Sequence, residues 1–348
     1  MKMKISKLLS AAFAATLLFT ISCRTDDPIV EPQPKGAYEN GIFMSNEGNF
    51  GTPTATVSFI SNDLATVENN VFSANNGNVA LGDVLQNIGF EGDNAYLILN
   101  NSNKIEIVNR YTFKKVATVT DQVSQPRYIA FANNNYYVTN SSGSSKFVNV
   151  YSTSTNAFVK KIDLTNTGER IVEASGKIFV QNASYGSGKK ITIINPTSNT
   201  IEKEVIIPNG NIQKTISTGG SVYTIASTTT DSYIYKLSPT GAISSTTTLT
   251  GIANATNLEI DGSKFYFTSG YKVYSMDITS TAVPTTPVLT LTDNSWSALY
   301  GFSVIDGKIF ISNANGFTAD STVEIYSTAG TLLKTITAGK GTSGFYKN

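Results

Sequence analysis

The chain has 348 residues, of which 40% are hydrophobic and 15% charged, with 26 basic and 25 acidic side chains giving a net charge of +1. This balance provides no global attraction to nucleic acid or to an anionic membrane, and no basic stripe with interleaved aromatics occurs. The sequence contains no histidine, so Ser-His-Asp catalysis, imidazole base catalysis and His-ligated metal sites are excluded.

The N-terminus has the pattern of an export signal. Three lysines between residues 2 and 7 precede an apolar stretch from Leu8 to Ile21, which is short for a membrane-spanning helix. Thr20-Ile21-Ser22-Cys23 resembles a bacterial lipobox, although Leu is more usual where Thr20 stands. We therefore expect residues 1–22 to be a lipoprotein signal peptide and Cys23, the only cysteine, to be lipidated. Secretion with cleavage nearby and an uncleaved anchor are the alternatives.

Residues 23–40 are polar and rich in proline, which is typical of a semi-extended tether. Asp26-Asp27 resembles the acidic export signal of surface lipoproteins in Bacteroidetes-type outer membranes. We therefore expect a lipid-anchored protein of the outer membrane that faces the extracellular side.

From residue 41 onward, an apolar strand carrying an aromatic residue recurs along the chain. The spacing is 41–44 residues, except for the first interval of 53. Each unit continues with two further strands separated by turns, in the period-2 pattern of half-buried antiparallel strands. Such a period predicts an all-β, seven-bladed β-propeller over residues 41–348. The recurring aromatics are Phe43, Tyr96, Tyr137, Phe179, Tyr223, Tyr266 and Phe310.

The first unit lacks an innermost strand, and the C-terminal segment SGFYKN (343–348) has the character to supply it. We expect this strand to join the first blade and close the ring, which removes exposed sheet edges. The long first interval falls in residues 73–86, and the glycine-rich loop 46–54 is also extended. Both are either functional loops or tolerated insertions.

Counting back nine or ten residues from each aromatic reaches the start of an innermost strand, near the axis at one face. Three adjacent blades have cations there, which would surround the channel mouth and suit an anionic, partly aromatic ligand. The alternative is that these cations pair with Asp83, Glu169 or Glu173 and only hold blades together. The predicted ligand-binding residues are Gln86, Arg127, Arg170, Lys214, Asn257 and Tyr300, with Tyr128, Tyr185 and Trp296 at the rim.

Trp296, the only tryptophan, is either an exposed recognition residue or a wedge between blades. We predict no catalytic residues, no bound metal and no cofactor. A hydrolase or lyase would need two paired carboxylates, and nothing in the spacing of the loop acids marks a pair. Those acids are Glu47, Asp83, Glu91, Asp93, Glu169 and Asp231.

Four segments together resemble a known family: FMSNEGNFG (43–51), LGDVLQNI (81–88), NNSNKIEIVNRYTFK (100–114) and QPRYIAF (125–131). They are similar to the YncE-like, surface-layer-type seven-bladed propeller lipoproteins of Bacteroidetes. This resemblance implies a non-enzymatic surface receptor that captures a corrinoid such as cobalamin, or a ferric siderophore, and delivers it to a TonB-dependent transporter. An adhesion or scaffold module that binds protein or glycan is the alternative, and a carboxylate-dependent hydrolase or lyase is a further one.

Overall fold

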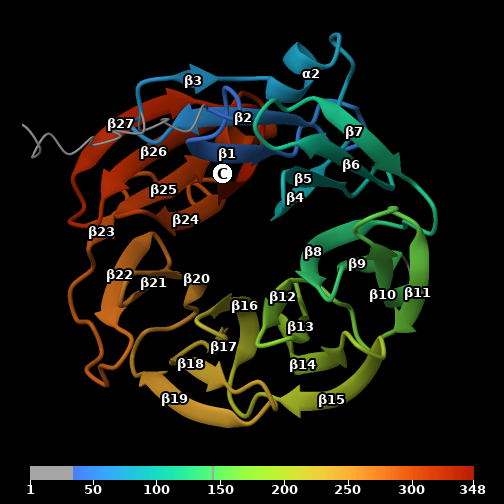
Figure 1. Cartoon of the computed structure of the whole chain (residues 1–348). Helices are drawn as coiled ribbons and strands as arrows, with labels where there is room; N and C mark the ends of the chain where they lie inside the picture. Colours follow the sequence, from blue (N-terminus) through green and yellow to red (C-terminus); the bar gives the residue numbers. More distant parts are fainter. Residues whose placement is uncertain (1–33, 143–144) are drawn as a thin grey trace, which may run out of the picture. The chain divides into compact units, whose positions relative to one another are not determined.

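The computed structural model describes residues 34–142 and 145–348. These residues form seven four-stranded antiparallel sheets arranged as the blades of a ring (Figure 1). The predicted seven-bladed β-propeller is therefore confirmed. The signal peptide, Cys23 and most of the predicted tether lie outside the described residues. No helix in the described part of the chain is long and apolar enough to cross a membrane.

The blades follow one another along the chain, and in blades 2 to 7 the first strand is innermost and the last is outermost. Blade 2 comprises β4 (Leu85–Glu91), β5 (Asn94–Leu99), β6 (Lys104–Asn109) and β7 (Lys115–Val119). Blade 3 comprises β8 (Pro126–Ala132), β9 (Asn135–Ser142), β10 (Ser145–Ser152) and β11 (Phe158–Asp163). Blade 4 comprises β12 (Ile171–Ala174), β13 (Lys177–Ser184), β14 (Ser187–Asn195) and β15 (Thr200–Ile206).

The remaining three blades repeat this order, with small departures in length. Blade 5 comprises β16 (Asn211–Thr218), β17 (Ser221–Ser227), β18 (Ser232–Leu237) and β19 (Ile243–Leu249). Blade 6 comprises β20 (Thr256–Asp261), β21 (Lys264–Ser269), β22 (Lys272–Asp277) and β23 (Leu289–Thr290). Blade 7 comprises β24 (Gly301–Ile305), β25 (Lys308–Asn313), the 3-10 helix η1 (Asn315–Phe317), β26 (Thr322–Ser327) and β27 (Leu332–Thr337).

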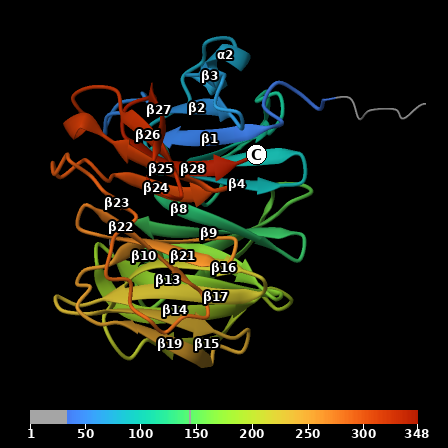
Figure 2. The same cartoon turned by 90° about the vertical axis from the view of Figure 1, so that its left-hand side faces the viewer.

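Blade 1 is assembled from both ends of the propeller. Its strands are β1 (Gly41–Asn46), β2 (Thr56–Ser61) and β3 (Val67–Glu68), and β28 (Thr342–Lys347) occupies the innermost place. β28 pairs antiparallel with β1, for example Met44 opposite Phe345, and Figure 2 shows the two strands running in opposite directions. Ring closure by the C-terminal strand is confirmed.

The seven recurring aromatics all lie on the second strand of a blade and are buried, from 0 to 6% exposed. The expected alternation of buried and exposed positions is wrong for these strands. In β5 and β13, for example, the central residues are buried on both faces. The physical reason is that each blade is covered on both sides by its neighbours, so long runs of exposed side chains occur on outermost strands such as β15.

The extra residues of the first interval form α2 (Val71–Asn75) and the loop that follows it. Val71 and Phe72 are buried in the cluster that contains Phe43 and Phe113. The Asn76 side chain donates to the carbonyls of Phe72 (2.7 Å) and Phe113 (2.9 Å). This insertion therefore packs blade 1 against blade 2.

The compact unit begins at Lys35, before the predicted boundary at residue 41. Tyr38 is only 3% exposed, and its backbone N–H donates to the carbonyl of Tyr111 at 3.0 Å. Tyr111 follows β6, whose end lies at the face where β1 begins and β28 ends. The chain therefore enters the propeller at the face opposite the starts of the innermost strands.

Candidate functional site

The candidate site lies where the innermost strands begin, around the mouth of the central channel. Five of these strands have a register shift at this point, for example between Pro126 and Ile129 in β8 and between Ile212 and Lys214 in β16. A bulge changes the direction of a side chain relative to the regular pleat. The bulges therefore let residues at the strand starts point into the channel rather than into the blade.

A cavity of about 180 Å³ occupies the channel. Gln86, Arg170 and Lys214 line it together with Glu259. A second cavity of about 170 Å³ lies beside it, toward blade 4, and is lined by Arg127 and Glu169. Tyr128 and Arg170 line both cavities. The structure thus brings four of the predicted site residues, Gln86, Arg127, Arg170 and Lys214, to two adjoining cavities.

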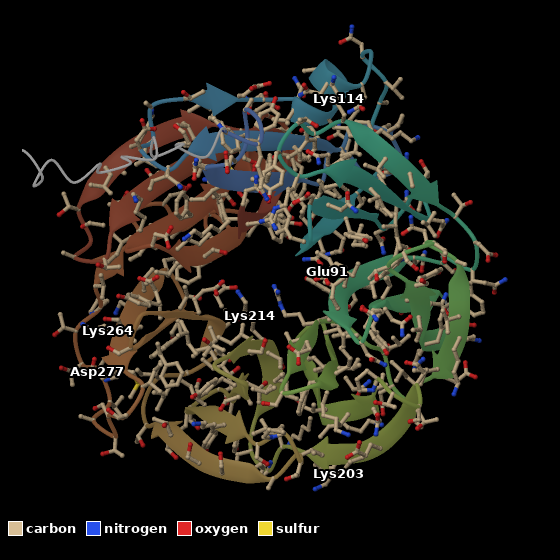
Figure 3. All side chains as sticks on the ribbon, viewed as in Figure 1. Glu91, Lys114, Lys203, Lys214, Lys264 and Asp277 are labelled. Atoms are coloured by element: carbon tan, nitrogen blue, oxygen red, sulfur yellow. The ribbon has the colours of Figure 1, made fainter. Side chains whose placement is uncertain are left out.

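Lys214 points toward the centre of the ring (Figure 3) and is 6% exposed. Its ammonium lies 2.6 Å from a carboxylate oxygen of Glu259 in blade 6. Burial lowers the pKa of Lys214 below its ordinary value of 10.5; Glu259 opposes this shift, and nearby Arg170 adds to it. The Lys214 charge is thus already paired within the protein.

Arg127 is paired in the same way. Its Nε and Nη2 atoms each lie 3.0 Å from Oε2 of Glu169, whose Oε1 accepts a hydrogen bond from Ser184 at 2.8 Å. Burial alone would lower the pKa of Arg127, but the Glu169 carboxylate outweighs it and the pKa is raised. The expectation that the cations pair with neighbouring acids holds for Arg127 and Glu169. Asp83 and Glu173 do not pair with these cations: Asp83 accepts from Asn101, and Glu173 from the Gly176 N–H.

Arg170 differs from the other two cations. Its guanidinium lies over the Tyr128 ring, 4.8 Å from the ring centroid, and it takes part in none of the ion pairs formed by the described residues. A guanidinium stacked on an aromatic ring keeps its edge N–H groups free for a carboxylate, phosphate or catecholate. Arg170 is therefore the cation at the mouth whose charge is available to a ligand.

The remaining predicted residues have local roles. Gln86 donates to the Tyr128 hydroxyl at 3.4 Å, and Asn257 donates to the Thr268 hydroxyl at 3.2 Å. The Tyr300 hydroxyl donates to Oε2 of Glu47 at 2.8 Å. Asn257, Tyr300 and Trp296 line neither of the two cavities.

Exposed aromatics stand on the loops of the same face. Trp296 is 72% exposed and stacks on Phe317 with a centroid distance of 6.1 Å, so it is not a wedge between blades. Tyr185, at the β13–β14 turn, is 95% exposed. Phe50, which was not among the predicted site residues, is 80% exposed on the β1–β2 loop. Its place in the long, non-repeating loop 46–54 was the available signal.

The loop acids considered for carboxylate catalysis do not all lie at one face of the ring. Glu91 and Asp93 border the turn that follows β4, at the face opposite the channel mouth, whereas Glu47 and Glu169 lie near the mouth with Tyr300 and Arg127 as partners. Asp231 accepts from the backbone N–H of Gly251 at 2.8 Å. Across residues 34–142 and 145–348, no group of three Asp, Glu or Cys side chains is placed to hold a metal ion.

The family model described as "Domain of unknown function (DUF5074)" matches residues 40–345. The chain belongs to the DUF5074 family. No curated protein matches it. This DUF5074 chain is similar in fold to a quinonprotein alcohol dehydrogenase-like protein from Bacteroides thetaiotaomicron, with a TM-score of 0.69 and 14% identity over 89% of this chain and 78% of the other.

Two further solved structures share the fold of this DUF5074 propeller. A functionally unknown protein from Desulfotomaculum acetoxidans has a TM-score of 0.64 and 14% identity, covering 88% of this chain and 98% of its own. AztD from Citrobacter koseri has a TM-score of 0.55 and 10% identity, covering 88% and 96%. At these identities the likeness concerns the fold alone. The resemblance to YncE-like capture lipoproteins therefore stays a prediction.

Proposed function

We propose that this protein is a non-enzymatic surface receptor that captures an anionic small nutrient at the channel mouth. The observation that carries the proposal is the position of Arg170, a cation without a carboxylate partner among the described residues, in the shared wall of two cavities. A charged group of this kind fixes the orientation of a ligand. The sequence resemblance to nutrient-capturing propellers supports the same reading.

The size of the cavities limits what can enter them. At about 180 and 170 Å³ they are smaller than typical small-ligand pockets of 300–1,000 Å³. A corrinoid or ferric siderophore would therefore place an anionic group beside Arg170 and lay its body across the face. Exposed Phe50, Tyr185 and Trp296 offer aromatic surface there. Loops held by a rigid ring lose little conformational entropy on binding.

Between the two ligand classes, the charge at the mouth favours a ferric siderophore. Carboxylate and catecholate oxygens match the fork of a guanidinium. Cobalamin, toward which the best-known relatives point, offers fewer negative groups. We therefore place ferric siderophores first and corrinoids second.

The direction in which the chain enters the propeller supports a role at a membrane. Tyr38 lies at the face opposite the channel mouth, and β1 begins at that same face. If Cys23 is lipidated, the tether attaches to that face and leaves the mouth free for ligand. Anchoring to the outer membrane would hold the receptor near a TonB-dependent transporter and raise the effective concentration for transfer.

The proposal is tested by calorimetric titration of the protein with cobalamin and with a panel of ferric siderophores. We expect saturable one-to-one binding of one of them. Arg170→Ala should weaken it at least tenfold, as expected for loss of a charged hydrogen bond. Lys203→Ala is the matched control, because Lys203 lies on β15 at the outer rim (Figure 3). Absence of binding across the panel would overturn the proposal and favour an adhesion or scaffold role.

A further inference from the structure

A larger cavity, of about 450 Å³, lies between blades 6 and 7, away from the channel mouth. It exists because β23, the outer strand of blade 6, has only two residues, whereas the outer strands of blades 2 to 5 and 7 have five to seven. Pro284 and Pro287 precede β23, and proline supplies no N–H for the ladder with β22. The short strand leaves part of blade 7 uncovered.

The lining of this groove combines an apolar floor with acidic groups. Leu289, Leu291 and Ile311 supply apolar surface, and Asp293 and Glu324 supply two carboxylates. No lysine or arginine is among the lining residues. Asp293 accepts from the Ser295 N–H and from the Asn313 amide, and Glu324 accepts from the Tyr326 hydroxyl at 2.6 Å. All of these donors are neutral.

Blade 2 has a glutamate, Glu106, at the position that corresponds to Glu324 in blade 7, and its charge is neutralised by neighbouring lysines. In β6, Glu106 pairs with Leu97, the residue after the recurring aromatic Tyr96. In β26, Glu324 pairs with Ile311, the residue after the recurring aromatic Phe310. Glu106 is 1% exposed and is neutralised by two ammonium groups, Lys104 at 3.1 Å and Lys115 at 3.0 Å.

Blade 7 lacks both of these lysines. By strand register, Thr322 stands where blade 2 has Lys104, and Leu332 stands where it has Lys115. Glu324 forms no ion pair within the described residues. Blade 2 neutralises its glutamate with lysines of its own chain, whereas blade 7 has none in this position. The groove therefore has the space and the negative charge to accept a cation from another molecule.

We propose that the groove between blades 6 and 7 is a binding site for an organic cation, an ammonium or guanidinium group on a short apolar stem. The cationic group would lie between Glu324 and Asp293, and the stem would pack on Leu289, Leu291 and Ile311. Charge-assisted hydrogen bonds and burial of the stem would act together. This site is separate from Arg170 and prefers the opposite charge, so it does not depend on the nutrient-capture proposal.

Agmatine, which carries an ammonium and a guanidinium on a four-carbon stem, is a suitable probe for the full-length protein. We expect saturable binding by calorimetry or by ligand-observed NMR, and none of 1,4-butanediol, which has a similar stem without charge. Glu324→Gln should weaken agmatine binding about tenfold, the usual effect of losing a charged hydrogen bond. Arg170→Ala should leave it unchanged.

Thr322→Lys provides a second, independent test. It restores the arrangement of Lys104 and Glu106, so the new ammonium should occupy the site and abolish agmatine binding while the melting temperature is kept or raised. Melting curves establish that both variants are folded. The proposal is wrong if agmatine does not bind at about 10 mM, a concentration that detects even millimolar affinity, or if Glu324→Gln and Thr322→Lys bind it as the unchanged protein does.

Discussion

The two ion pairs of the channel join equivalent parts of adjacent blades. Arg127 and Glu169 are 42 residues apart, and Lys214 and Glu259 are 45 residues apart, which in each case is close to one blade. Both pairs are largely removed from solvent, so each charge depends on its partner. They link the residues at the innermost strands of neighbouring blades around the channel.

Replacing Lys214 alone should therefore be more harmful than replacing the pair. Lys214→Met leaves the Glu259 carboxylate without its cation, and we expect a loss of about 3 kcal/mol in the free energy of unfolding. The double variant Lys214→Met/Glu259→Leu should recover most of that loss, since apolar packing often replaces such a pair without penalty. Urea denaturation measures both, and equal stability of the two variants would contradict this role.

Glu47 gives the protein a specific pH dependence. Burial raises its pKa above the ordinary value of 4.5, and the hydrogen bond from Tyr300 only partly offsets this. Because the folded state holds this proton more tightly than the unfolded state, stability falls as pH rises from 4.5 through the folded pKa. In Glu47→Gln this loss should vanish, so the variant gains stability relative to the wild-type protein as the pH rises above 4.5. Parallel profiles in urea would contradict the assignment.

Which residues form the site could be predicted only in part. The spacing of the recurring aromatics places Arg127, Arg170 and Lys214 at the starts of adjacent innermost strands, so their positions could be predicted from the sequence. Glu259 was not predicted as a partner. It lies further along its strand, after a bulge between Thr256 and Glu259 that no sequence pattern indicates. Glu169 was among the predicted partners, and a search for acids one repeat beyond each cation would have found Glu259 as well.

At the scale of strands, the recurring aromatics and turns predicted the blades because each blade is built from local antiparallel pairing. The exceptions are the two-residue outer strands β3 and β23. The length of β23 depends on Pro284, Pro287 and the irregular segment before it rather than on a periodic pattern. The groove between blades 6 and 7 follows from that one short strand. It could not be predicted from the repeat, because the repeat describes what the blades share.

The closing strand β28 should be among the least tolerant elements. Phe345 is 5% exposed in the cluster that contains Met44 and Phe310, so Phe345→Ala should cost about 3 kcal/mol and speed hydrogen exchange in β1 and β24. Lys347→Ala is the matched control in the same strand. Its side chain is half-exposed and pairs with Asp306, so the change should stay within about 0.5 kcal/mol. Equal costs for the two variants would show that β28 does not seal the ring.

At the scale of the molecule, the two faces of the ring differ. One has the channel mouth, Arg170 and the exposed aromatics, and the other receives the chain near Tyr38. Coupling the protein to a surface through its N-terminus should therefore preserve binding of the ligand identified by calorimetry. Coupling through a cysteine introduced at Gly51, on the mouth face, in a Cys23→Ser background should block it. Surface plasmon resonance compares the two, and equal capacities would place the binding site elsewhere.

The union of β1 and β28 in one sheet also has a consequence for the order of folding. Each of blades 2 to 7 forms from strands that are consecutive in the chain, whereas blade 1 keeps an unpaired edge on β1 until Thr342–Lys347 has joined it. The ring therefore cannot close before this distant segment has docked. A variant cut before Thr342 should keep an open sheet edge that proteases and chaperones can recognise.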